Sequence, residues 1–174
     1  MNTQKGDTHW YAVYTRPNAE KKVYEQLETM GHNVYLPLVT SIRKWSDRTK
    51  KISSPLISTF VFIRIPEDRV YDALKAKGAL GILKYLSRPA VIKDHEIENL
   101  RILMNDASEV SQINDEIFEN GEDVVVVKGP FTGLMAQSVL IKGKRRIIVK
   151  IDALGTIMEV NLPLSFVARK GKMK

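Results

Sequence analysis

The sequence contains no cysteine, and only three of its 174 residues are histidine. Without a thiol there is no disulfide framework, no cysteine-ligated metal and no cysteine nucleophile. His9, His32 and His95 are not spaced as a metal-binding pair, and the sequence has neither a nucleophile elbow nor a Walker phosphate loop. We therefore expect a protein that is not an enzyme and that needs no metal and no other cofactor.

Long apolar runs are also missing. The longest ones, such as residues 60–63 and 124–127, are far shorter than the roughly 20 residues of a membrane-spanning helix. Residues 1–8 are polar and lack the apolar core of a signal peptide. We expect a cytoplasmic protein without a membrane partner, and we expect it to act as a monomer.

The net charge of +7 is unevenly distributed. Residues 1–104 carry 17 basic and 11 acidic side chains, residues 105–120 carry five acidic side chains and no basic one, and residues 121–174 carry 10 basic and four acidic ones. A basic surface attracts nucleic acid through counterion release, but many basic proteins never bind it. The charge therefore supports nucleic-acid binding without establishing it.

The apolar pattern of residues 1–104 predicts an α+β domain with the order β-α-β-β-α-β-α. This order is that of a ferredoxin-like α/β sandwich, in which the helices cover one face of a sheet. Asn18 is expected to cap the first helix, and residues 46–51 are expected to form a basic hairpin tip. The predicted strands are 9–15, 34–45, 52–65 and 80–86, and the predicted helices are 19–30, 67–77 (with Val70, Ala73 and Leu74 facing inward) and 94–104.

The second half of the chain predicts a small β domain. Residues 105–120 lose all periodicity and are acidic, which is the composition of a flexible linker. Residues 129–133 read GPFTG, where the proline presets a turn and the glycines permit positive φ. Five short β-rich segments surround this turn and predict a five-stranded barrel: 122–128, 136–141, 145–151, 156–162 and 166–168.

Two sets of side chains in the first half are candidate binding residues. Alternation along the strand separates Phe60 and Phe62 from Val61 and Ile63, so the two aromatic rings should lie on the face without helices. They form either a docking surface for another protein or ordinary core beneath the third helix or the linker. The residues leave this choice open.

The second set is basic and lies at the corner between the first strand and the first helix. Cations at an exposed corner suit phosphate contacts, and an asparagine could add base contacts. A solvated surface is the competing interpretation, and the residues alone favour it. The corner consists of Arg16, Asn18, Lys21 and Lys22, with Arg43, Lys44, Arg48, Lys50 and Lys51 around the hairpin.

The order of several motifs resembles the NusG family from about residue 9 to residue 169. These motifs are residues 10–14 (WYAVY), 55–63, 88–92 (RPAVI) and 121–133. The resemblance implies a polymerase-binding NGN domain over residues 1–104, a linker over 105–120 and a KOW barrel over 121–174.

Residues 10–63 and 43–48 are more similar to the specialised RfaH and UpxY paralogues than to housekeeping NusG. The sequence departs from the family pattern in two places. Residues 57–59 are Ile-Ser-Thr where the family usually has Phe-Pro-Gly, and Ala136 replaces the glycine of most KOW motifs.

The resemblance implies a factor that docks on the clamp helices of bacterial RNA polymerase and suppresses pausing or termination, at specific operons such as those for capsular polysaccharide. Its docking residues would be Tyr14, Ile57, Phe60 and Phe62. By the same resemblance, Arg16 and Lys22 would contact the non-template DNA strand. Asn18 and Lys21 of the basic corner complete the expected nucleic-acid-binding residues.

The KOW domain would recruit a further partner such as the ribosome or Rho. Residues 124–127 and 146–149 have strong β character, which argues against a helical form of this domain. Two alternatives remain: a housekeeping NusG-type elongation or termination factor, and a KOW-containing RNA-binding protein of the translation apparatus.

Overall fold

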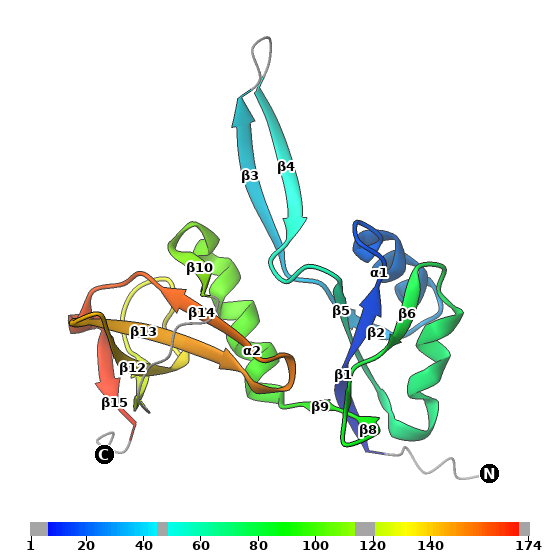
Figure 1. Ribbon diagram of the computed structural model, residues 1–174. Helices are drawn as coiled ribbons and strands as arrows, with labels where there is room; N and C mark the ends of the chain where they lie inside the picture. The colour runs from blue at the N-terminus through cyan, green and yellow to red at the C-terminus, as the bar shows by residue number, and fades with distance from the viewer. Residues whose placement is uncertain (1–6, 45–48, 114–120, 171–174) are drawn as a thin grey trace. The chain divides into compact units, whose positions relative to one another are not determined.

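The computed structural model describes residues 7–44, 49–113 and 121–170. The chain forms two compact units, residues 1–94 and residues 95–174 (Figure 1). Strands occur in both units and are accompanied by helices, so the mixed α/β fold predicted from the sequence is confirmed.

The first unit contains an antiparallel sheet in the order β2-β5-β1-β6. Its two central strands, β1 and β5, pair through seven residues, from Thr8 opposite Pro66 to Tyr14 opposite Phe60. Strand β9 also pairs with β1. The strands of this sheet are β1 (Thr8–Thr15), β2 (Asn33–Tyr35), β5 (Phe60–Pro66), β6 (Ala79–Ile82) and β9 (Val91–Ile92).

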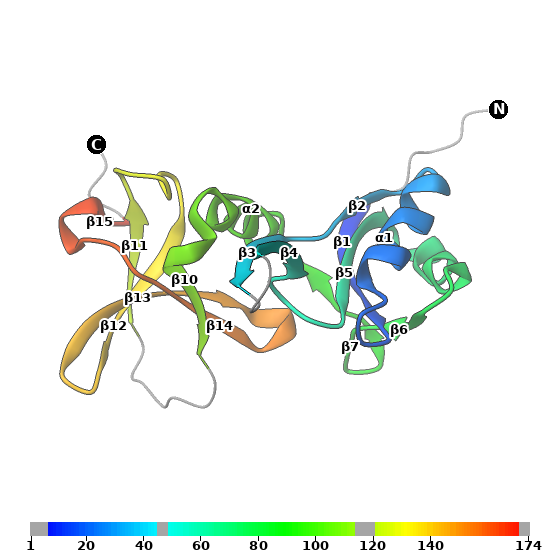
Figure 2. The ribbon, with the colours of Figure 1, turned by 90° about the horizontal axis from the view of Figure 1, so that it is seen from above.

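Two helices pack on one face of this sheet, α1 (Glu20–Thr29) and the 3₁₀ helix η1 (Glu67–Lys75). Figure 2 shows α1 beside β1 and β5. The strands contribute alternate residues to the core because side chains on a strand repeat every two residues. The buried side chains of this core include Tyr11, Val13, Val61 and Ile63 from the strands, Val23 and Leu27 from α1, and Val70 and Ala73 from η1.

The prediction that Leu74 faces inward is wrong, because its side chain is 38% exposed. The reason is the tighter helix. A 3₁₀ helix has about three residues per turn, so residues three apart share a face. Val70, Ala73 and Ala76 form that inner row and are buried.

The predicted strand 52–65 is divided in two. Its first part belongs to β4 (Thr49–Pro55), which pairs only with β3 (Leu38–Lys44) in a two-stranded sheet. This hairpin extends away from the main sheet of its unit (Figure 1). Residues 46–48 of the predicted tip, and the side chains of Arg43, Lys44 and Lys50, lie outside the described residues. The predicted strand 80–86 is divided as well, into β6 and β7 (Lys84–Tyr85), and β7 pairs with β8 (Arg88–Pro89).

The second unit contains a six-stranded sheet in the order β10-β14-β13-β12-β11-β15. All five strands predicted after residue 121 are present, with ends that differ by at most two residues. Their bounds, with those of the sixth strand, are β10 (Val110–Ile113), β11 (Glu122–Val126), β12 (Met135–Ile141), β13 (Lys144–Ile151), β14 (Thr156–Val160) and β15 (Val167–Arg169). Two short 3₁₀ helices, η3 (Asp152–Leu154) and η4 (Leu164–Phe166), complete the unit.

The predicted linker is structured over its first half. Helix α2 (Asp94–Leu103) continues into the 3₁₀ helix η2 (Met104–Glu109) and then into strand β10, which pairs with β14. The sequence predicts α2 as the last helix of the first domain, whereas the structure groups it, from His95 onward, with the second unit. Residues 114–120 of the predicted linker lie outside the described residues.

The GPFTG turn has the backbone that its residues predict. Gly129 and Gly133 both have positive φ, and the Gly133 N–H donates to the Val126 carbonyl at 2.8 Å. A Cβ atom on Gly129 would lie 2.8 Å from the Phe166 ring. Phe131, the middle residue of this turn, is buried.

Thr59, in the turn that joins β4 to β5, has a φ of +65°. A β-branched residue is strained in this left-handed region, which glycine adopts freely. Threonine at this position therefore has a conformational cost that glycine would not have. The turn is held all the same, because the Thr15 N–H donates to the Thr59 carbonyl at 2.9 Å.

We predict that Thr59→Gly stabilises the protein by about 1 kcal/mol, because it removes the left-handed strain. The gain is reduced by the greater entropy of glycine in the unfolded chain. Urea unfolding followed by tryptophan fluorescence, with Ser58→Gly at the neighbouring exposed position as control, measures the difference. A loss of stability in Thr59→Gly would show that its φ is not a source of strain.

Candidate functional site

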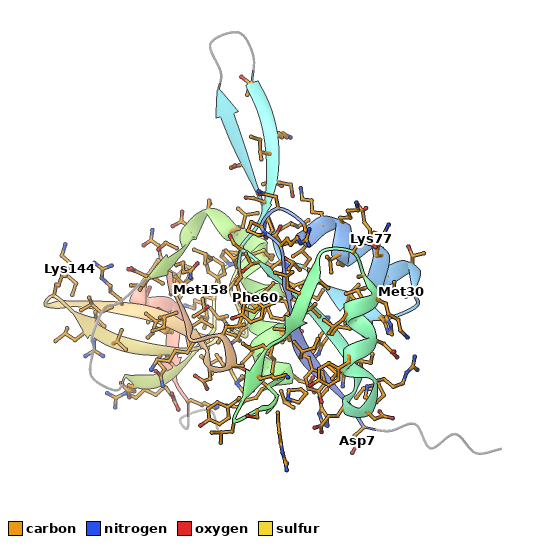
Figure 3. The ribbon with its side chains drawn as sticks, turned by 45° about the vertical axis from the view of Figure 1, so that its right-hand side comes forward. Asp7, Met30, Phe60, Lys77, Lys144 and Met158 are labelled. Atoms are coloured by element: carbon orange, nitrogen blue, oxygen red, sulfur yellow. The ribbon has the colours of Figure 1, made fainter. Side chains whose placement is uncertain are left out.

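An aromatic pair lies at one end of the main sheet. The β1–β5 register places Tyr14 opposite Phe60, and their ring centroids are 4.3 Å apart with the planes tilted by 45°. The pair lies on the sheet face opposite to Val13 and Val61, because neighbouring residues on a strand point to opposite faces. The Tyr14 side chain is 41% exposed and Phe60 is half-buried. Figure 3 labels Phe60 at the start of β5.

The other two predicted docking residues are buried. Phe62 has no exposed surface and stacks on Tyr35, with 6.3 Å between ring centroids, while Ile57 is 4% exposed. In this structure Phe62 is thus ordinary core, which is one of the two alternatives that the residues leave open. Of the four predicted docking residues, Tyr14 and Phe60 are therefore the two that offer aromatic surface to a partner without rearrangement.

The basic corner begins directly after β1. Residues 16–19 form a turn, closed by the Ala19 N–H donating to the Arg16 carbonyl at 3.0 Å, and Asn18 takes a φ of +64°. The prediction that Asn18 caps α1 is wrong, because the cap position is Ala19 and no side chain caps the helix. The Asn18 side chain is exposed instead.

The cations at this corner differ in their contacts. Arg16 and Lys22 are exposed, and the charged groups of their side chains form no hydrogen bond or ion pair with another described residue. Lys21 is engaged, because its Nζ donates to the Ser53 carbonyl of β4 at 2.5 Å. Lys21 therefore joins α1 to the β3–β4 hairpin, and Arg16 and Lys22 are the two cations available to an anionic partner.

Glu20 connects the basic corner to the aromatic pair. Its side chain lies in the first turn of α1 and accepts a hydrogen bond from the Thr59 N–H at 2.8 Å. Glu20 is buried, with only 5% of the residue exposed. Thr59 immediately precedes Phe60. From the sequence alone, Glu20 is explained as a negative charge at the positive end of the helix dipole. No local pattern indicates its contact with Thr59, which lies 39 residues away.

This arrangement is suited to binding rather than to bond chemistry. An exposed aromatic pair offers apolar surface for protein contact, and nearby unpaired cations offer contacts to phosphate. Among the described residues, no group of three or more His, Cys, Asp or Glu side chains could hold a metal ion. No helix in the described ranges is long and apolar enough to cross a membrane. The aromatic pair and the two exposed cations are therefore the candidate binding residues of the first unit.

Comparison with known proteins identifies the family. Residues 8–101, more than half of the chain, match the family described as NusG, transcription termination factor nusG. The chain belongs to the NusG family. Factors of this family are non-enzymatic and act with RNA polymerase, which confirms the prediction that the chain is not an enzyme.

Curated relatives match over nearly the full length. The transcription termination/antitermination protein NusG of Rickettsia felis is 24% identical, covering 92% of this chain and 90% of that protein. The Rickettsia conorii protein of the same name is 25% identical with the same coverage. A solved structure, "Domain interaction in Thermotoga maritima NusG", is 24% identical with a TM-score of 0.48, covering 93% of this chain and 97% of that one. By its family match, the chain is a NusG-type transcription termination/antitermination factor.

We predict that Glu20→Ala destabilises the first unit by about 1–3 kcal/mol, because the Thr59 N–H loses a charged acceptor in a buried place. Glu25→Ala, at an exposed position of the same helix, is the matched control and should change stability by less than about 0.5 kcal/mol. Chemical unfolding of both variants measures the effect. Equal stability of the two would mean that the Glu20–Thr59 contact does not hold the turn.

Proposed function

We propose that this chain is a specialised NusG-family factor of the RfaH and UpxY type, which binds bacterial RNA polymerase and suppresses pausing or termination at specific operons such as those for capsular polysaccharide. Its sheet β2-β5-β1-β6 would belong to an NGN domain (1–104 by sequence), and strands β11–β15 would form a KOW barrel (121–174). We expect it to act in the cytoplasm as a monomer.

The observation that carries this proposal is the position of the aromatic pair beside the free cations. Tyr14 is the last residue of β1 that pairs with β5, and Arg16 follows two residues later. Glu20 fixes the start of α1, which carries Lys22, to the turn before Phe60. A protein surface and a nucleic-acid strand that lie side by side, as in a transcribing polymerase, could therefore be bound together.

For the polymerase contact, Tyr14 and Phe60 would supply the accessible surface. Buried Ile57 and Phe62 would support the pair from within the unit, so their role would be to position it. Aromatic side chains near the centre of an interface commonly dominate its binding energy. The clamp helices of the polymerase are the proposed partner surface.

For the DNA contact, Arg16 and Lys22 would bind phosphates of the non-template strand. Asn18, exposed and not engaged as a helix cap, would contact base edges and could supply sequence preference. Lys21 would act indirectly by fixing the hairpin to α1. In this arrangement the two cations would supply affinity for DNA, and the asparagine would supply specificity.

The mechanism would be stabilisation by differential binding. A ligand shifts a conformational equilibrium only as far as its affinities for the two states differ. A factor that binds the elongating polymerase more tightly than the paused one would favour elongation about tenfold for each 1.4 kcal/mol of that difference. No covalent step is needed. The KOW domain would recruit a further partner such as the ribosome or Rho.

A housekeeping NusG-type elongation or termination factor fits the family assignment equally well. The two functions share a fold and a docking surface and differ in the number of genes affected. Transcript profiling after deletion of the gene separates them, since a general factor alters most operons and a specialised factor alters a few.

We predict that Phe60→Ala and Tyr14→Ala each weaken binding to core RNA polymerase by about 2 kcal/mol, on the order of 30-fold, because each removes an accessible ring of the pair. Tyr85→Ala is the matched control, since Tyr85 is a 73% exposed tyrosine elsewhere in the same unit. Binding is measured by fluorescence anisotropy, and circular dichroism verifies folding. Unchanged affinity in both folded variants would eliminate this docking surface.

We predict that Arg16→Ala and Lys22→Ala reduce recruitment to the transcribing polymerase at one promoter-proximal sequence, and that each lowers the salt dependence by about 0.7 in the log–log slope. Lys144→Ala, an exposed lysine of the second unit, serves as the control. Recruitment is measured on elongation complexes halted along a template. Wild-type recruitment and slope in both corner variants would exclude the DNA contact.

A further inference from the structure

The segment 95–113, which we call the clasp, lies within the second unit and comprises nearly all of α2, η2 and β10. It precedes the five strands that the sequence predicts for this unit. The clasp contacts the rest of the unit at three places, and at each of them it hydrogen-bonds to backbone atoms.

The first place is the inner side of α2, where two polar side chains are buried. Asn99 is 4% exposed, and its carboxamide donates to the Met135 carbonyl at 2.8 Å and accepts from the Met135 N–H at 3.1 Å. Glu96 is 2% exposed and accepts from the Asp152 N–H at 2.7 Å. Burying polar groups is costly unless they are hydrogen-bonded, so these contacts hold α2 in one position on the unit.

The second place is the edge of β14. Four residue pairs join the two strands, from Val110 opposite Val160 to Ile113 opposite Ile157, and Figure 2 shows β10 beside β14. Ile113 packs against the core cluster of the unit. At the start of β10, the Glu109 carbonyl accepts from the Asn161 N–H at 2.8 Å, and its carboxylate accepts from Asn161 Nδ2 at 2.6 Å.

The third place is the GPFTG turn. Asn105 Nδ2 donates to the Pro130 carbonyl at 3.0 Å. A Cβ atom on Gly133 would lie 3.7 Å from Ile102 Cδ1, so α2 runs directly alongside this turn. One continuous segment therefore covers both the turn and the outer edge of β14.

Strand β14 would be an edge strand of the sheet without β10, because β13 is its only other neighbour in the strand order. An edge strand presents unpaired N–H and C=O groups that can pair with another extended chain. The contact that closes this edge is short, and Ser111 and Gln112 in it are exposed.

We propose that the clasp is an autoinhibitory element: the edge of β14 is a docking site for an extended segment of a partner protein, and β10 occupies that site in cis. The partner segment would carry an apolar residue in the place of Ile113 and a hydrogen-bond acceptor in the place of Glu109. Release of β10 would be required before the partner binds. This proposal concerns the second unit alone and does not depend on the polymerase contact of the first.

The occupancy of the site by β10 sets the apparent affinity for any segment added in trans. If only a fraction of molecules has the clasp open, the apparent Kd is the intrinsic Kd divided by that fraction. Weakening the clasp should therefore tighten binding in trans while leaving β14 unchanged.

The test uses the full-length protein and a fluorescent synthetic peptide with the sequence of residues 107–113. Ile113→Asp in the protein removes the apolar anchor of the clasp, and Glu109→Ala removes its carboxylate contact to Asn161. We expect peptide binding to tighten on the order of tenfold or more for Ile113→Asp, from the lost apolar burial. For Glu109→Ala we expect a gain of about 2–10-fold, from the lost hydrogen bond.

Gln112→Ala is the matched control, since it changes an exposed residue of the same strand and should bind the peptide as the wild type does. A peptide with aspartate in the place of Ile113 should not bind. Amide hydrogen exchange of residues 157–160 should be faster in the two opened variants, which reports the free edge directly. Glu109→Ala leaves the core intact, so it remains informative if Ile113→Asp does not fold.

Two results would overturn the proposal. If Glu109→Ala exchanges faster at β14 but binds the peptide no better than the wild type, the edge is not a docking site. If the wild type and the opened variants bind the peptide equally tightly, β10 does not block the site.

Discussion

The register between β1 and β5 is the constraint on which the first unit depends. These two strands are central in the sheet, and their pairing assigns alternate residues to opposite faces. Val13 and Val61 enter the core, whereas Tyr14 and Phe60 meet on the other face. A slip of one residue would exchange the two faces, because side chains on a strand repeat every two residues. One set of backbone hydrogen bonds thus builds both the core and the candidate docking surface.

The Glu20–Thr59 hydrogen bond couples this sheet to the first helix. Its acceptor is the buried carboxylate of Glu20, and its donor is the backbone of Thr59, which has a strained φ. Burial of the charge and strain of the backbone each cost stability. Strain of this kind persists when the surrounding contacts over-determine the conformation, and it is concentrated at functional sites. Here the strained residue lies directly before Phe60, at the junction of the aromatic pair and the basic corner.

The second unit shows the same dependence on backbone groups at the edges of a sheet. Asn99 makes with Met135 the two hydrogen bonds that a neighbouring strand would make, and β10 makes a real ladder with β14. Unpaired backbone groups are costly when buried and invite foreign strands when exposed. The clasp satisfies them from within the chain, and this is why residues 105–113 are structured although their composition is that of a linker.

Local patterns in the sequence determined much of this protein: the strands after residue 121, the GPFTG turn, the extents of α1 and α2, and the order of motifs that resembles the NusG family. Each depends on residues close together in the chain, through periodicity of two or 3.6 and through the backbone preferences of glycine and proline. The basic corner was predictable for the same reason, because Arg16 and Lys22 are near neighbours in sequence.

Only the tertiary structure decided which of these residues are available to a partner. Phe62 is buried while Phe60 is accessible, Lys21 is engaged with Ser53, and residues 110–113 form a sheet strand. Alternation assigns a residue to a face but does not say what covers that face. The contacts responsible join residues 27 to 52 positions apart, from Tyr35 with Phe62 to Glu109 with Asn161, and no local pattern encodes them.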